Sequence, residues 1–285
     1  MTSSHKLARP ALLLVGAVLS FGSVGTASFA IATGLVASTT DSTARYDATA
    51  IDRIVVHNAG RVRVTGVPDA IESAEASGSA ESADGPEFPA ASAPDGNSVA
   101  PDEITVRRTL YQSFSEPTID DHVEGTTLYL ESRCSGLAGR ICFGDVEIVA
   151  PERVAVDIGG NDVQVRNTSG SVTITVRAGG ASLSNVSGPL ELDIFGGGVQ
   201  ATGVRSEQVS ATLVAGALDM AFDASPLSVD AAVTGGSINL AVPSDATSYR
   251  IDSSGSTTVL VPVDPASRHR LNLSARGGNI RVANR

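Results

Sequence analysis

The stretch GGNDVQVRNTSGSVTITV, residues 159–176, contains two short runs in which apolar and polar residues alternate, separated by a glycine turn. Strict alternation is the pattern of a β-strand that buries one face and exposes the other. The same pattern continues well beyond residue 176. The stretch is therefore interpreted as one unit of a repeat rather than as an isolated hairpin.

The repeat consists of two interleaved series of strand-like runs. Runs of the first series follow a glycine or a turn and begin every 18 to 21 residues, at Val163, Ala181, Val199, Leu218, Ser237, Thr258 and Asn279. Runs of the second series lie between them: SVTITV at 171, LELDIF at 190, QVSATL at 208, LSVDAA at 227, YRIDSS at 249 and HRLNLSA at 269. Each run alternates apolar and polar residues.

A period of about 20 residues with two strands predicts an all-β fold, a two-sided β-solenoid or β-roll in which each coil stacks on the next. Glycines such as Gly170, Gly188 and Gly198 fall between the runs, where a chain must turn a corner. An antiparallel meander folded into a sandwich is the alternative, because it would use the same strands and turns. The alternation of short and long runs favours the solenoid.

The N-terminal region has the composition of a membrane segment. No charged residue lies between Arg9 and Asp41, and residues 11–37 are long enough to cross a bilayer as a hydrophobic helix. Lys6 and Arg9 precede this helix, so residues 1–10 are expected in the cytoplasm and the rest of the chain outside the cell membrane. The sequence AIA at 30–32 resembles a signal-peptidase site, and cleavage there would give a secreted protein instead of an anchored one.

Residues 38–50 are expected to link this segment to one domain at 51–284. Within the domain, residues 68–101 carry seven acidic residues, five prolines and no basic residue. Such a composition cannot bury enough apolar surface to fold, so it predicts a disordered acidic insert. Strand-like sequence at 51–66 and 103–114 places the insert inside the domain; a linker between a stalk and the domain is the alternative.

The chain has two cysteines, Cys134 and Cys142, separated by seven residues. In an exported domain such a pair predicts a disulfide, and two unpaired buried thiols are the alternative. A structural zinc site needs about four ligands, for which two cysteines and scattered histidines are too few. We therefore expect the pair to have a structural role and predict no metal.

Charge and motifs exclude several classes of function. The net charge is −11 and Lys6 is the only lysine, which argues against binding to nucleic acid. The sequence FGGGVQA at 195–201 has the glycine spacing of a dinucleotide-binding turn, but another β-type run follows it where a helix would be required. It is interpreted as a corner, and no cofactor is predicted.

One weak candidate for chemistry is the sequence TIDDHVEG, which gathers Asp120, Asp121, His122 and Glu124. These side chains could bind a metal or act as acid and base, but a solvated turn between strands has the same composition. Adjacent coils do not stack Asp or Glu in the regular row that a glycan-cleaving solenoid would need. We therefore expect no catalytic residue.

Several segments occur in a recognisable order: VVHNAGRVRVTG at 55–66, GTTLYLESRC at 125–134, the cysteine pair, DVEIVAP at 145–151, and then GNDVQV, SGSVTITV, GGSINLAVP and GGNIRV. In this order the sequence resembles the bacterial putative-adhesin family over about residues 51–284. The resemblance implies an envelope-associated, non-catalytic β-roll or solenoid behind an N-terminal membrane segment. It supplies no catalytic residues, and the acidic insert departs from it.

The function expected from these features is an extracytoplasmic, membrane-anchored, adhesin-like interaction or scaffold domain that binds cell-wall polymer or an envelope protein. One alternative is a glycan-acting enzyme on a β-solenoid, with Asp121, His122 and Glu124 as its site. Another is a self-assembling envelope structural protein, because the final run NIRVANR could leave an unpaired strand edge guarded only by Arg281 and Arg285.

Overall fold

The computed structural model describes residues 39–68, 102–111, 117–134 and 143–285, which are almost entirely β-strands. The short 3-10 turn η1 (Ala48–Ala50) is the one helical element in these ranges. The all-β prediction is confirmed. The predicted helix at 11–37 lies outside these ranges, and within them no helix has the length and apolarity to span a bilayer.

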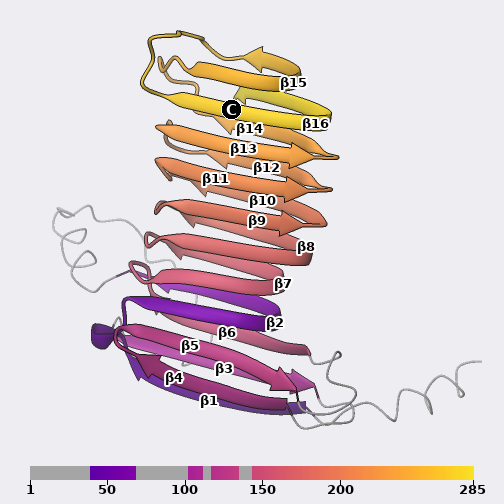
Figure 1. Cartoon of the computed structure of the whole chain (residues 1–285). Coiled ribbons are helices and arrows are strands. Elements are labelled where there is room, and N and C mark those ends of the chain that lie inside the picture. Colours follow the sequence, from indigo (N-terminus) through magenta and orange to yellow (C-terminus); the bar gives the residue numbers. More distant parts are fainter. Residues whose placement is uncertain (1–38, 69–101, 112–116, 135–142) are drawn as a thin grey trace, which may run out of the picture.

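The strands stack along one long axis, with β1 and β4 at the bottom of Figure 1 and β15 at the top. All of them belong to one network of pairings with 16 strands. They are β1 (Thr39–Asp47), β2 (Arg53–Val67), β3 (Glu103–Tyr111), β4 (Pro117–Glu124), β5 (Thr127–Cys134), β6 (Phe143–Pro151), β7 (Ala155–Thr168), β8 (Val172–Val186), β9 (Leu190–Phe195), β10 (Gly197–Val204), β11 (Gln208–Val214), β12 (Ala217–Phe222), β13 (Ser228–Thr234), β14 (Ser237–Val242), β15 (Arg250–Leu260) and β16 (Arg270–Asn284).

From β7 onward the strands pair in parallel. The long strand β8 pairs with β9 through its first half and with β10 through its second half. At the other end β16 pairs with β13 and β14 in the same manner. The pairings β8–β10–β12–β14–β16–β13–β11–β9–β8 therefore close into a ring of eight parallel strands.

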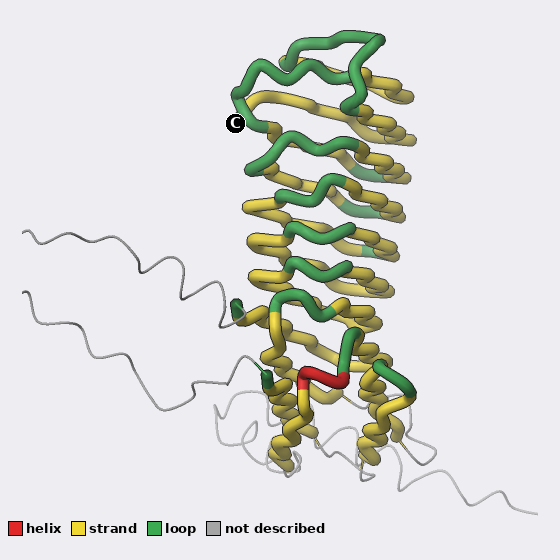
Figure 2. Tube along the Cα trace, turned by 90° about the vertical axis from the view of Figure 1, so that its left-hand side faces the viewer, coloured by secondary structure: helices red, strands yellow, loops and turns green. Residues whose placement is uncertain are grey.

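This ring has two sides, which lie along the length of the stack (Figures 1 and 2). We call face A the outward surface of β9, β11 and β13, continued by the first halves of β2, β7, β8, β16 and β15. Face B is the outward surface of β10, β12 and β14, continued by the second halves of the same long strands. Loops join the two sides, as the green segments of Figure 2 show.

The core consists of apolar columns that run along the stack between the two sides. One column contains Val172, Leu190, Val209, Val229 and Leu271, which are register partners and at most 3% exposed. Burial of each such side chain stabilises the fold by about 2 kcal/mol. The residues between them point outward, and this explains the alternation found in the sequence.

A second kind of column is formed by glycines at one corner: Gly179, Gly197, Gly216, Gly236 and Gly278. A Cβ atom on Gly197, Gly216, Gly236 or Gly278 would overlap the carbonyl oxygen of the glycine one coil earlier. The backbones approach too closely there for any side chain. The GGG of residues 196–198 therefore forms a corner, as the sequence predicted.

The lower end of the stack has a different topology. There β2 pairs in parallel with β5, β6 and β7, whereas β3 pairs antiparallel with β1 and β6, and β4 pairs antiparallel with β5. Strands β2 and β3, which flank the predicted insert, belong to one sheet through β6; residues 69–101 lie outside the described ranges. Cys142 also lies outside them, so the disulfide remains a prediction.

The upper end corrects one prediction. Strand β16 follows β15 in the sequence but lies between β15 and the pair β13 and β14 (Figure 1). Ile280 aligns with Ile238 of β14 on one side and with Thr257 of β15 on the other. The prediction that the run NIRVANR leaves an unpaired edge, guarded by Arg281 and Arg285, is therefore wrong. In the described part of the chain, the open edge at the upper end belongs to β15.

Some of the apolar columns finish in polar residues, whereas two others end in Ile251 and Val259 of β15, which pack against the core. On β15, Ser253 and Thr257 align with the buried Leu273 and Ile280 of β16 and thus occupy inward positions. At the lower end the inward residues include Arg108 of β3. A column that ends in polar groups offers little apolar surface for a further coil.

Candidate functional site

The predicted cluster at 120–124 lies on β4, so these residues form a strand and not a turn. Successive side chains of a strand point to opposite faces. Asp121 accordingly points into the interior, whereas Asp120, His122 and Glu124 are exposed on the outer surface. No group of three or more His, Cys, Asp or Glu side chains is arranged to hold a metal among the residues that the structure describes.

Asp121 takes part in a buried ion pair that the sequence did not reveal. The Nη2 of Arg108, whose side chain is 5% exposed, lies 2.6 Å from Oδ2 of Asp121. The Tyr46 hydroxyl donates a hydrogen bond to the same oxygen at 2.8 Å. Burial, followed by this hydrogen bond, raises the pKa of Tyr46 above its ordinary value of 10.0. The pair joins β3 to β4 across the lower end of the core.

The outward members of the cluster have other neighbours. The His122 ring stacks on Tyr129 of β5, with ring centroids 5.0 Å apart and planes inclined by 10°. Asp120 aligns with Glu131 of β5, and Glu131 aligns with His57 of β2. The structure thus brings His57, which lies in the run VVHNAGRVRVTG, into the same row as Asp120.

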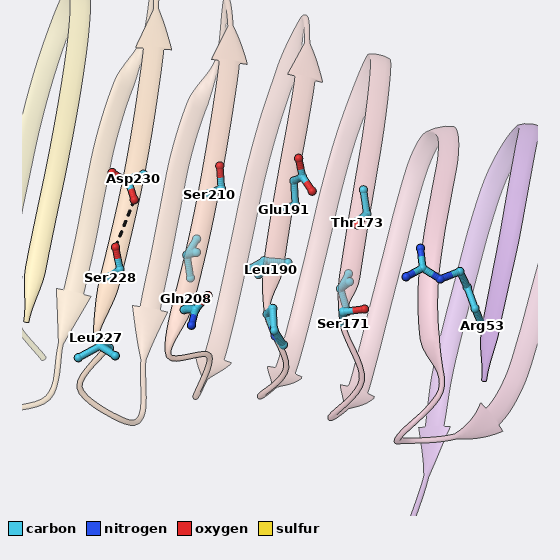
Figure 3. A pocket seen from close by; sticks show the side chains of 13 residues that line it. Arg53, Ser171, Thr173, Leu190, Glu191, Gln208, Ser210, Leu227, Ser228 and Asp230 are labelled. Carbon is cyan, nitrogen blue, oxygen red and sulfur yellow. Dashed lines mark hydrogen bonds between the residues drawn. The ribbon is translucent and has the colours of Figure 1, made fainter.

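The more extensive candidate site is a shallow groove on face A with a volume of about 620 Å³. Figure 3 shows it crossing β8, β9, β11 and β13, with Arg53 of β2 at one end and Leu227 at the other. Its outward side chains are hydroxyls, amides and carboxylates, because these are the alternate residues of strands whose other face fills the core. No aromatic side chain lines the described groove.

Carboxylates recur along face A on every second strand, and two of them, Glu191 and Asp230, line the groove. One row of register partners runs in stack order as Asp157, Thr173, Glu191, Ser210, Asp230, Asn272 and Asp252. Adjacent strands lie about 4.8 Å apart, so neighbouring acidic residues in the row are separated by about 10 Å. Adjacent coils lack a continuous acidic row, as the sequence indicated. An alignment of the sequence runs position by position would nevertheless have revealed the alternation of acidic and neutral polar residues.

The upper part of the row bonds to itself, and the centre does not. Asp230 accepts hydrogen bonds from Ser228 at 3.2 Å and from Asn272 at 3.0 Å. Within the described part of the chain, Glu191 and Ser210 have no side-chain hydrogen bond or ion pair. The centre of the groove therefore presents unpaired polar groups to solvent.

The groove has the chemistry of a binding surface. Glu191 and Asp230 are both exposed, with Ser210 between them. Among the residues that the structure describes, no base lies within hydrogen-bonding reach of Ser210 to activate it as a nucleophile. The arrangement can hold a ligand through hydrogen bonds and charge.

Comparisons with known proteins give structural neighbours only. No protein-family model matches the sequence, and no curated protein matches it either. The fold is similar to a "putative cell adhesion protein" from Clostridium sporogenes, with 10% identity, a TM-score of 0.36 and coverage of 87% of this chain and 100% of that one.

Two further neighbours carry similar names. A "putative adhesin" from Bacteroides fragilis has 16% identity and a TM-score of 0.37, covering 87% of this chain and 98% of that one. Another from Parabacteroides distasonis has 13% identity and a TM-score of 0.30, covering 85% and 97%.

Proposed function

We propose that this protein is a non-catalytic, adhesin-like interaction module of the bacterial cell envelope. In this proposal residues 11–37 anchor the chain in the cell membrane and the β-domain lies on the extracytoplasmic side, where Cys134 and Cys142 form a disulfide. The stack acts as a two-sided β-solenoid, with each face a continuous surface for a partner. The partner is a cell-wall polymer or an envelope protein.

The observation that carries the proposal is the groove on face A. Its carboxylates, hydroxyls and amides stand on strands that pair on both sides, so the backbone is held before a partner arrives. A preorganised surface loses little conformational freedom on binding. Many weak polar contacts repeated along the stack suit an extended partner better than a small molecule in a closed pocket.

The direct test is sedimentation of the purified full-length protein with cell-wall fragments from its host, together with crosslinking in intact envelopes. We expect the wild type to sediment with the wall or to crosslink to one envelope protein. Ser210→Arg places a long cation in the centre of the groove and should abolish that association. Ser169→Arg makes the same change at an exposed position outside the groove and should leave it intact.

The proposal fails if the wild type neither sediments with the wall nor crosslinks to an envelope protein. It also fails if Ser169→Arg reduces the association as much as Ser210→Arg does, because the contact would then not lie on face A.

A further inference from the structure

The opposite side of the stack carries a second polar site. Ser182 and Ser184 of β8 align with Gln200 and Thr202 of β10. We call these four residues the face B quartet. They line a groove of about 480 Å³ together with Arg166, Asn167 and Asn185. The groove continues through Gln200 and Thr202 into another of about 370 Å³ that crosses β12, β14 and β16.

Polar side chains below the quartet on face B are bonded to one another. Arg61 pairs with Asp145 at 3.4 Å and with Asp162 at 3.2 Å. Glu147 lies within 3.7 Å of guanidinium nitrogens on both Arg63 and Arg107. These groups satisfy one another and leave little capacity for a ligand.

A similar pairing occurs above the quartet, where Asn239 of β14 donates to Asp219 of β12 at 2.6 Å. In the described part of the chain, by contrast, no side-chain hydrogen bond is formed by Ser182, Ser184, Gln200 or Thr202. Three of the four are exposed and Ser184 is half-buried. The quartet therefore offers unpaired hydrogen-bonding groups on face B between these two paired regions.

The chemistry of the quartet selects a class of ligand. A hydroxyl group both donates and accepts hydrogen bonds, and a glutamine amide offers two donors and an acceptor. None of the four carries a charge, so a strongly charged polymer gains nothing from them. Sugar hydroxyls also donate and accept, and they can exchange hydrogen bonds with all four side chains.

The shape of the adjoining groove agrees with this choice. Ala221, Ala241 and Ala283 line it with small, half-buried side chains on neighbouring strands. Small residues let the ring of a ligand approach the sheet closely. The row of small residues crosses the strands, so an extended chain can follow it along the axis of the stack.

We propose that the face B quartet binds a neutral glycan chain that lies across β8 and β10 and extends over β12 and β14. This site is separate from the groove on face A and does not depend on it. The protein would thereby hold two partners on opposite sides of one rigid stack.

The experiment measures binding of two neutral probes, cellohexaose and the hexamer of N-acetylglucosamine, to the full-length protein in a detergent without sugar groups. Saturation-transfer NMR observed on the ligand detects weak association. We expect both the wild type and the control double variant Thr175→Val/Thr212→Val, on face A but outside its groove, to bind at least one probe. The double variant Gln200→Ala/Thr202→Val should bind at least tenfold more weakly.

The control removes two hydroxyl groups from exposed positions on the other face, so misfolding would affect both variants. The inference is overturned if neither neutral probe binds the wild type, or if the two double variants lose binding equally. It is also overturned if a hexamer of galacturonic acid binds as tightly as the neutral probes, because recognition would then rest on Arg166. A protein that sediments with the wall but binds no hexasaccharide retains the function proposed for face A and loses this one.

Discussion

The glycine column predicts that one methyl group can disrupt the stack. Gly216 lies between Gly197 and Gly236 at the same corner, and a Cβ on Gly216 would overlap the Gly197 carbonyl oxygen. The obstacle is backbone, which no side-chain rotation can relieve. Gly216→Ala must therefore displace one coil from the next.

The cost of Gly216→Ala follows from the bonds at this corner. The displacement breaks the hydrogen bond from the Gly197 amide to the Ala215 carbonyl, 3.0 Å, and that from the Ser237 amide to the Gly216 carbonyl, 3.3 Å. Two such bonds contribute about 1 kcal/mol each, and overpacking adds about 2 kcal/mol. We expect Gly216→Ala to lower the free energy of unfolding by about 4 kcal/mol.

Urea unfolding followed by circular dichroism tests this value. With a denaturant dependence of about 2 kcal/mol per molar, the midpoint should fall by about 2 M. The control is Gly198→Ala, whose Cβ would lie 3.4 Å from the Ala217 carbonyl oxygen, close to ordinary contact. We expect its midpoint to stay within about 0.5 M of the wild type. Equal midpoints for both variants would refute the steric account of the corner.

Three further predictions concern the two ends of the core. Arg108→Ala removes the charged partner of Asp121, whose side chain is 19% exposed, and should lower the free energy of unfolding in urea by about 3 kcal/mol. Replacing both Arg108 and Asp121 by leucine should cost less, and equal losses would contradict this account. The pKa of Tyr46 is raised in the folded state, so the stabilisation linked to this residue is fully present below pH 10.0 and is lost as the pH rises through the folded pKa. Urea unfolding at increasing alkaline pH should therefore show a smaller loss of stability for Tyr46→Phe than for the wild type. Parallel losses in the two proteins would contradict the assignment to Tyr46. The double variant Ser253→Val/Thr257→Ile extends two apolar columns to the open edge of β15. Sedimentation velocity should then show concentration-dependent association of the variant that the wild type lacks. A variant that remains monomeric would show that the polarity of these two residues does not prevent further stacking.

The repeating part of the fold was largely predictable. Val172, Leu190 and Val209 are the first apolar residues of successive runs in the second series, and they align in the structure. One face of each strand fills the core and the other contacts water. The polarity of each residue in a run therefore indicates directly whether its side chain points inward or outward. The outward row of face A was not predicted, although the same alignment would have revealed it if the polar residues had been compared as well.

The ends of the stack were not predictable in this way. Arg108 and Asp121 lie on strands β3 and β4, and nothing local in the sequence shows that their side chains meet inside the core. The order of β15 and β16 was also hidden, because both strands have the same alternation and the same spacing. Ser253 and Thr257 occupy inward positions of β15, and polar residues are tolerated at such positions only on a strand at an open end. Their polarity could be interpreted in this way only after the tertiary position of β15 was known.

The insertion of β16 beneath β15 has a consequence for biosynthesis. A chain leaves the ribosome from its N-terminus, so β15 emerges before the strand on which it lies. Until residues 270–284 appear, β13 and β14 both present open parallel edges and the ring of eight strands cannot close. Assembly of the upper coils must therefore wait for this late segment. During that interval the edges of β13 and β14 are the places where a chaperone would bind or a strand from a neighbouring nascent chain would attach.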